Sequence, residues 1–306
     1  MISYAQNAED VVLARVFAGQ ATGRYVDLGA GHPVEDSVTK HFYDLGWRGI
    51  NIEPEPTLAA RLRAERPEDV NRAVAIGAAP GRTVLHVVDG QWGRSTVDDS
   101  LAARYREGED WPVSDVEVEV LTLAALLDEH PGEVDFLKID VEGAERAVVE
   151  GADWSRHRPR VIVVEATEPG SPKPAFEEWE PVLLDAGYRL GLFDGLNRFY
   201  AAKTDGDALA LLTAPANIFD DYVPYATALL REDREHAQEQ RAAEVAYIRR
   251  LQEKLQQAEA ATATQAARLE ELGSRLEAAS QDTEHARRYS AALENRIAEL
   301  ERQRDA

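Results

Sequence analysis

The chain has 306 residues, 44% of them hydrophobic and 29% charged, which is enough for one sizeable core and an additional extension. It contains no cysteine, and this excludes disulfides, thiolate metal sites and cysteine nucleophiles. The formal net charge of −22 is concentrated in residues 1–225, which carry 21 basic and 40 acidic residues, so we expect no nucleic-acid substrate.

The N-terminal residues, MISYAQNAEDVV, lack the basic and apolar regions of a signal peptide. No apolar run in the chain approaches the roughly 18 residues that a membrane-spanning helix requires. We therefore expect a cytoplasmic protein with no transmembrane segment.

Between residues 24 and 225, short β-branched runs alternate with amphipathic stretches, a pattern typical of βα units that pack helices against a parallel sheet. The apolar runs predict strands at 24–30, 49–54, 70–76, 134–140 and 160–166. An open sheet of this kind binds its ligand at the carboxyl ends of the strands.

Two local patterns mark the connections of this sheet. Val38, Phe42 and Leu45 recur at helical spacing between the first two strands, and Gly46 suits the end of that helix. Near residue 200, the runs YRLGLF and RFYAA flank the turn 194–197, which predicts a terminal antiparallel hairpin.

The composition changes near residue 226, beyond which proline is absent and Ala, Glu, Gln, Arg and Leu dominate. We expect residues 1–225 to form one domain and residues 226–306 a coiled coil that joins copies of the chain into a homo-oligomer. Polar residues interrupt the heptad pattern, so a single charged helix or a partly disordered tail stays open as the alternative. The heptad positions are Ile248, Leu255, Leu269, Leu276 and Ile297 in one register, and Leu251, Ala258, Leu272, Ala279, Ala286, Leu293 and Leu300 in the other.

A glycine-rich sequence, Asp-Leu-Gly-Ala-Gly at 27–31, lies at the end of the first predicted strand and forms the turn that leaves it. Gly29 and Gly31 let the backbone approach a ligand closely, so we expect both to contact a cofactor. The third glycine of the dinucleotide fingerprint is missing, which disfavours a nicotinamide cofactor.

Two carboxylates flank this turn. Glu53 closes the second strand, where an acidic side chain can accept hydrogen bonds from ribose hydroxyls. Asp27 ends the first strand and suits a ligand that carries an ammonium group. Together they favour S-adenosylmethionine as the cofactor, with solvated strand-end carboxylates as the alternative reading.

Longer segments resemble the FkbM-type methyltransferases. They are SYAQNAEDVVLARVF, YVDLGAGHPVEDSVTKHFYDLGWRGINIEPEP, FLKIDVEGAERAVVEGADW, VVEATEP and FDGLNRFYAA, in the family's order over residues 1–225. The resemblance implies a Rossmann-like class I methyltransferase fold with a mainly parallel seven-stranded sheet. It also implies methyl transfer from S-adenosylmethionine to a hydroxyl of a sugar or glycosylated metabolite, in surface-glycan or secondary-metabolite biosynthesis, with a glycosyltransferase as a possible partner.

An alcohol acceptor needs a general base or a metal ion, because its pKa is about 15. Asp140, at the carboxyl end of the fourth predicted strand and inside the family motif, is the expected base, and Glu142 is a second catalytic candidate. Glu165 ends the fifth strand on the same rim and is expected, with Asn197, to contact the acceptor. Carboxylates that converge there are suited to Mg²⁺, although their spacing is not a recognisable metal signature.

Two other functions stay open on the sequence. One is a scaffold in which the coiled coil is functional and the α/β domain is not catalytic. The other is a nicotinamide-dependent oxidoreductase, which the missing glycine disfavours. His32 in the glycine turn is an alternative base.

Overall fold

The computed structural model of the chain describes residues 1–108 and 111–304. The chain divides into two compact units, Met1–Leu230 and Arg231–Ala306. Among the described residues no helix combines the length and the apolar character that crossing a membrane requires.

A seven-stranded sheet forms the centre of the first unit. The five strands β9, β8, β2, β3 and β4 are parallel, and β11 runs antiparallel to β9 and pairs with β10 in a hairpin. The predicted Rossmann-like sheet and its terminal hairpin are therefore confirmed. The strand order is β10 (Tyr188–Phe193), β11 (Asn197–Ala202), β9 (Val161–Glu165), β8 (Phe136–Ile139), β2 (Arg24–Leu28), β3 (Arg48–Ile52) and β4 (Val70–Arg72).

Alternate side chains of each strand enter two separate cores, because successive residues of a strand point to opposite faces. In β2, Val26 and Leu28 belong to one core, whereas the adjacent residue Tyr25 belongs to the other. Helices cover both faces, which makes the unit a three-layer α/β/α structure. The first core is covered by α5 (Leu123–Glu129), α6 (Glu145–Glu150) and α7 (Glu180–Asp185), and the second by α1 (Glu9–Val16), α2 (Lys40–Asp44) and α8 (Gly206–Leu211).

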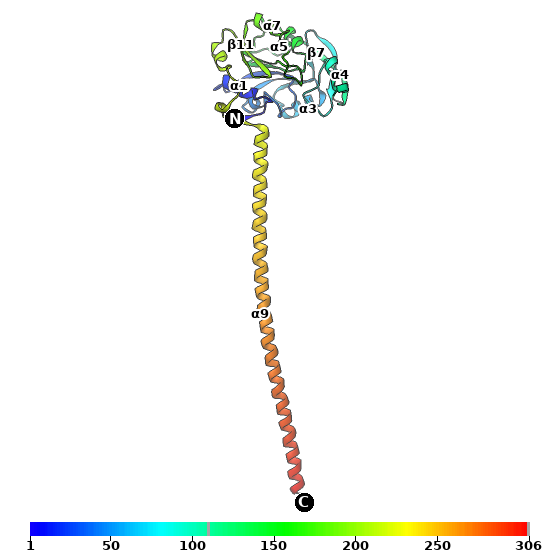
Figure 1. Cartoon of the computed structure of the whole chain (residues 1–306), viewed down its shortest axis with the longest axis vertical. Helices are drawn as coiled ribbons and strands as arrows, with labels where there is room; N and C mark the ends of the chain where they lie inside the picture. Colours follow the sequence, from blue (N-terminus) through cyan, green and yellow to red (C-terminus); the bar gives the residue numbers. More distant parts are fainter. Residues whose placement is uncertain (109–110, 305–306) are drawn as a thin grey trace. The chain divides into compact units, whose positions relative to one another are not determined.

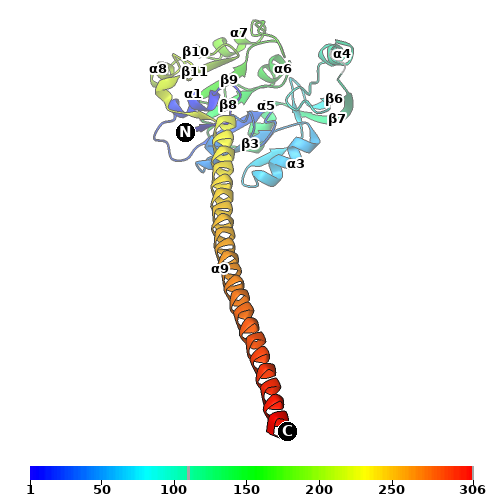
Figure 2. The same ribbon diagram turned by 60° about the horizontal axis from the view of Figure 1, so that its bottom comes forward.

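The predicted strand at 70–76 is in fact two strands in different sheets. β4 stays in the large sheet, but β5 (Ala75–Ile76) joins a three-stranded sheet with β7 (Val113–Leu121) and β6 (Gly81–Val88). This small sheet and α4 (Asp99–Gly108) lie at the opposite end of the unit from the terminal hairpin (Figures 1 and 2). Strand pairing between segments distant in the chain decided this division, so local patterning did not predict it.

The remaining elements are short, except at the C-terminus. α3 (Pro56–Glu65) follows β3. A single 3-10 turn, Ile218–Asp220, precedes β12 (Val223–Pro224), and β12 pairs with β1 (Ile2–Ser3) from the other end of the first unit. One uninterrupted helix, α9 (Tyr225–Arg304), makes up the described part of the second unit (Figure 1).

Candidate active site

The glycine turn after β2 closes against the end of β8. Gly29 and Gly31 adopt φ angles of +76° and +59°, which favour glycine. A Cβ atom on Gly29 would overlap the backbone oxygen of Asp140. The amides of Gly29 and Ala30 donate to the backbone oxygen of Ile52 at 2.9 and 3.0 Å, so the turn is fixed to β3 on one side and touches β8 on the other.

Glu53 holds the same turn from the end of β3. Its Oε2 accepts a hydrogen bond from the amide of Gly31 at 2.8 Å, and its Oε1 accepts one from the amide of Glu55 at 2.9 Å. Burial raises the pKa of Glu53 to about 7, although these hydrogen bonds act in the opposite direction. Each carboxylate oxygen keeps a second lone pair for a ligand hydroxyl.

Asp27 lies under the turn. Its side chain is buried, accepts a hydrogen bond from Thr39 Oγ1 at 2.8 Å and approaches Lys138 Nζ to 3.5 Å. The buried guanidinium of Arg66 donates in turn to Thr39 and Ser37, both at 2.7 Å. Asp27, which the sequence placed on the cofactor, therefore supports the loop that forms the cavity wall and does not itself line the cavity.

Two adjoining cavities open at the carboxyl ends of β2, β3, β8 and β9. The first, which we call the apolar cleft, has a volume of about 700 Å³. The second, which we call the polar basin, is larger, at about 1490 Å³, and carries most of the charged groups. Gly29, Gly31, Gly93, Asp140 and Glu142 line both cavities and so mark where they meet. The apolar cleft is further lined by Ile52, Pro54, Leu58, Val74, Ala75, Ile76, Leu85 and Val97, and the polar basin by Gln6, Glu9, His32, Asp36, Trp92, Arg94, Lys138, Glu165 and Thr167.

Lys138 supplies the positive charge at this junction. Its Nζ donates to the backbone oxygen of Gly29 at 2.7 Å and lies 3.2 Å from Asp140 Oδ2. Burial lowers the pKa of Lys138, but the carboxylates of Asp140 and Asp27 outweigh burial and raise it above its ordinary value. Lys138 is therefore a cation that connects the end of β8 to the end of β2 and its glycine turn. Lys138 lies inside the matched segment FLKIDVEGAERAVVEGADW, but its place in that segment does not by itself indicate this role.

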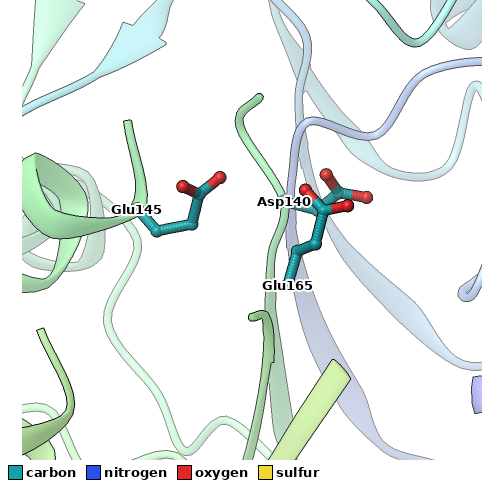
Figure 3. Close-up of side chains that lie close together, drawn as sticks. All are labelled: Asp140, Glu145 and Glu165. Atoms are coloured by element: carbon teal, nitrogen blue, oxygen red, sulfur yellow. The ribbon is translucent and has the colours of Figure 1, made fainter. Parts of the chain in front are cut away.

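Three carboxylates converge beside this lysine (Figure 3). Oxygen atoms of Asp140, Glu145 and Glu165 all lie within 4.8 Å of one another. Glu145 points toward the other two from the first turn of α6 and also accepts hydrogen bonds from the amides of Val141 and Gly143. Glu142, the second catalytic candidate from the sequence, is not one of these three residues, although it lines both cavities. The fold brings in Glu145 because α6 begins beside the end of β9.

The pKa values of the surrounding acids rise for a common reason. Burial raises the pKa of Glu165, and the nearby charges of Asp140, Glu142 and Glu145 raise it further. Burial also raises the pKa of Glu142, again with help from Asp140 and Glu145. Glu165 Oε2 is buried without a hydrogen-bond partner. The cluster therefore favours protons or a cation among these carboxylates.

Asn197 connects two segments that are far apart in the chain. Its buried side-chain amide donates to Glu9 Oε1 at 2.7 Å, across 188 residues. Glu9 lines the polar basin, and so do Gly195 and Leu196 of the hairpin turn, but Asn197 does not. Asn197 thus positions Glu9. Burial raises the pKa of Glu9 to about 7.

The small sheet and the loop that joins β6 to α4 form one wall of the two cavities. Leu85 and Val97 line the apolar cleft, and Trp92 and Arg94 line the polar basin. Thr96 Oγ1 donates to the backbone oxygen of Glu142 at 2.7 Å. This hydrogen bond connects the loop between β6 and α4 to the loop after β8. Leu85, Trp92, Arg94, Thr96 and Val97 lie outside every matched segment, so the sequence motifs do not indicate them.

The family model described as the Methyltransferase FkbM domain matches residues 27–190. A comparison with curated proteins gives no match.

Several solved structures are similar to the chain at low identity. The FkbM methyltransferase of Methylobacillus flagellatus KT is 16% identical with a TM-score of 0.38, over 61% of this chain and 47% of that protein. The TehB-like S-adenosylmethionine-dependent methyltransferase of Corynebacterium glutamicum is 10% identical with a TM-score of 0.35, over 63% and 87%. CalO1, a methyltransferase of calicheamicin biosynthesis, solved with S-adenosylhomocysteine bound, is 15% identical with a TM-score of 0.29, over 64% and 54%. The chain thus spans about half the length of the first of these proteins.

Proposed function

The chain belongs to the FkbM methyltransferase family, whose enzymes depend on S-adenosylmethionine, and we propose that it methylates a hydroxyl oxygen of a sugar or glycosylated metabolite. One observation carries this proposal. Asp140, like its neighbour Glu142, lines both the apolar cleft and the polar basin, so its carboxylate borders the space where a donor in the cleft and an acceptor in the basin would meet.

The apolar cleft suits the nucleoside part of the donor. Ile52, Leu58 and Ile76 offer apolar contacts to an adenine ring, and Glu53 at the end of β3 offers carboxylate oxygens to a ribose diol. Beside Gly31 there is room for the rest of the donor, because a Cβ atom there would meet nothing nearer than the Trp92 ring at 3.9 Å. The sulfonium methyl group would then lie toward the polar basin, where Asp140 is.

The polar basin suits a polyhydroxylated acceptor. Glu9, Glu165 and Thr167 present oxygen atoms that accept hydrogen bonds from hydroxyl groups, and Arg94 presents donors for hydroxyl oxygens. Trp92 and His32, whose ring centroids are 5.6 Å apart, form an aromatic wall next to them. Such a mixture of polar groups and one aromatic face matches a sugar better than an apolar ring.

The proposed step is an in-line displacement at the methyl carbon. The acceptor oxygen forms a bond to that carbon as the carbon–sulfur bond breaks, and both bonding electrons stay on sulfur. The hydroxyl proton passes to the carboxylate of Asp140, and the products are a methyl ether and S-adenosylhomocysteine. Lys138 holds Asp140 through its ion pair at 3.2 Å.

We extend this proposal to a divalent cation such as Mg²⁺. The residues that would hold it are Asp140, Glu145 and Glu165, whose oxygens lie within 4.8 Å of one another and are the donor type that hard cations prefer. The buried, unpartnered Oε2 of Glu165 fits such a ligand. The ion would supply neutralisation of these carboxylates and a lower pKa of a nearby hydroxyl.

The function is tested by incubating the purified chain with S-adenosylmethionine and a panel of free sugars, nucleotide sugars and glycosylated metabolites, while S-adenosylhomocysteine release is measured. We expect release that depends on an acceptor with a free hydroxyl. Calorimetry with S-adenosylhomocysteine is run in parallel. Absence of both binding and release would instead favour the scaffold function, in which the α/β unit is not catalytic.

A further inference from the structure

The second unit exposes an apolar stripe that no residue of the described chain covers. α9 has no buried residue. With Ile248 assigned to position a of a heptad, every large exposed hydrophobic side chain from residue 231 to residue 304 falls at position a, d, e or g, and none falls at b, c or f. Ile248, Leu255 and Leu276, for example, are 53%, 61% and 73% exposed.

From this stripe and the charges beside it, we propose that α9 pairs with α9 of a second copy of the chain as a parallel, in-register, two-stranded coiled coil. The inference does not depend on the proposed methyl transfer. It concerns the partner of the helix and the direction in which that partner runs.

The charges at the flanking positions select the parallel direction. In a parallel pair, each g residue faces the e residue that follows it by five positions in the other copy. From residue 248 onward, this places Lys254 beside Glu259, Asp282 beside Arg287, and Arg296 beside Glu301 of the second copy. Every charged pair made in this way is attractive, because the other g residues with charge in this stretch, Arg268 and Arg275, face Gly273 and Ser280.

An antiparallel pair would reverse these contacts. Antiparallel helices place g beside g and e beside e, and from residue 248 onward the charged g residues are mostly basic while the charged e residues are mostly acidic. Like charges would then face one another along the contact between the two helices, which is unfavourable. In this stretch the charged g residues are Lys254, Arg268, Arg275, Asp282 and Arg296, and the charged e residues are Glu259, Arg287, Glu294 and Glu301.

The polar residues at positions a and d select the register of the two helices. In an unshifted parallel pair, Thr262, Gln265 and Ser290 each meet the same residue of the second copy, so polar side chains face polar side chains. A shift of one heptad would bring the side-chain amide of Gln265 against Ala258 or Leu272 of the second copy. Buried polar groups without partners are costly, so the unshifted register is preferred.

Cysteine cross-linking of the full chain tests the direction, because the chain has no cysteine of its own. Ser290 occupies position a and Ser274 position f, so Ser290→Cys and Ser274→Cys are the same change on the inner and outer faces. Under mild oxidation we expect a disulfide-linked dimer from Ser290→Cys and little from Ser274→Cys. Consider instead an antiparallel pair whose centre is the middle of the stretch from Ile248 to Leu300. The two thiols introduced by Ser290→Cys would then lie roughly 30 residues, or about 45 Å, apart and would not cross-link.

Charge reversal tests the contacts themselves. Lys254→Glu with Arg296→Glu should raise the dimer dissociation constant at least about 10-fold in sedimentation equilibrium, and adding Glu259→Lys with Glu301→Arg should restore it. Circular dichroism confirms that each variant stays helical. The proposal would be overturned by a monomeric or trimeric native chain, or by equal cross-linking of both serine variants. It would also be overturned if the dimer dissociation constant did not change on charge reversal.

Discussion

Lys138 Nζ lies 3.2 Å from Asp140 Oδ2, and the same amino group donates to the backbone oxygen of Gly29 at 2.7 Å. One buried cation therefore fixes the carboxylate proposed as the base and the turn that forms the wall of the apolar cleft. In the proposed mechanism, the position of the base and the shape of the donor site are therefore coupled through this side chain.

Asp140→Asn should abolish most turnover and leave donor binding intact. Asparagine keeps the shape of the side chain but cannot accept the hydroxyl proton, so we expect kcat to fall by about 10²–10⁴. Calorimetry with S-adenosylhomocysteine should give a Kd within about 3-fold of the native value. Asp128→Asn, the same change at an exposed residue that pairs with Arg156, serves as the control. Full turnover of Asp140→Asn would exclude Asp140 as the base.

Lys138→Met should lower kcat at least about 10-fold, because methionine fills a similar volume without holding Asp140. The loss should be much smaller in the Asp140→Asn background, since the two residues act together. Stability should also fall, by about 3 kcal/mol, because the buried carboxylate of Asp27 loses its cation. Additive losses of kcat in the double variant would show that Lys138 does not act through Asp140.

Glu53→Gln should weaken donor binding. Glutamine has one acceptor oxygen where Glu53 uses two, so either Gly31 or Glu55 loses its hydrogen bond and the glycine turn loosens. A loss of about 1–3 kcal/mol corresponds to a Kd for S-adenosylhomocysteine that is about 5- to 150-fold higher. Glu65→Gln, an exposed position at the end of α3, is the matched control and should bind normally.

The stability of the protein should fall as the pH rises from about 4.5 to about 7, and Glu9 should contribute to this fall. Burial raises the pKa of Glu9 to about 7 from an ordinary 4.5, so in this window the native state holds a proton that the unfolded chain has released. The stabilisation is complete below about pH 4.5 and is lost by about pH 7, and it amounts to at most about 3 kcal/mol.

Urea unfolding at pH 5.0 and 7.5 measures this effect. Glu9→Gln removes the titration, so the difference in unfolding free energy between the two pH values should shrink, although Glu53 and Asp10 still contribute. The exposed substitution Glu65→Gln should leave the difference unchanged. An unchanged difference in Glu9→Gln would mean that Glu9 stays ionised in the native protein.

Removal of divalent cations tests the carboxylate cluster. If Asp140, Glu145 and Glu165 hold Mg²⁺, EDTA should reduce turnover at least about 10-fold and added Mg²⁺ should restore it. Calorimetric Mg²⁺ binding to the native chain should disappear in Glu165→Gln and persist in Glu178→Gln, an exposed glutamate paired with Arg146. Turnover that is indifferent to EDTA, with no Mg²⁺ binding, would leave protons as the neutralising charge.

The regular architecture follows from local patterning. The runs at 24–30 and 160–166 became β2 and β9, and the hairpin around residues 194–197 formed where its turn residues indicated. Each of these elements is specified by side chains within a few residues of one another, which is why a single sequence predicts it. The heptad spacing of α9 is local in the same sense.

Tertiary structure alone decided how the site is assembled. It placed Lys138 between Asp27 and Asp140, brought Glu145 to Glu165, and joined Asn197 to Glu9 across 188 residues. Tertiary structure also decided that residues 70–76 divide between two sheets, as β4 and β5. These contacts depend on strand register and on which strands are neighbours, and burial then sets the pKa values, so local sequence carries no signal for them.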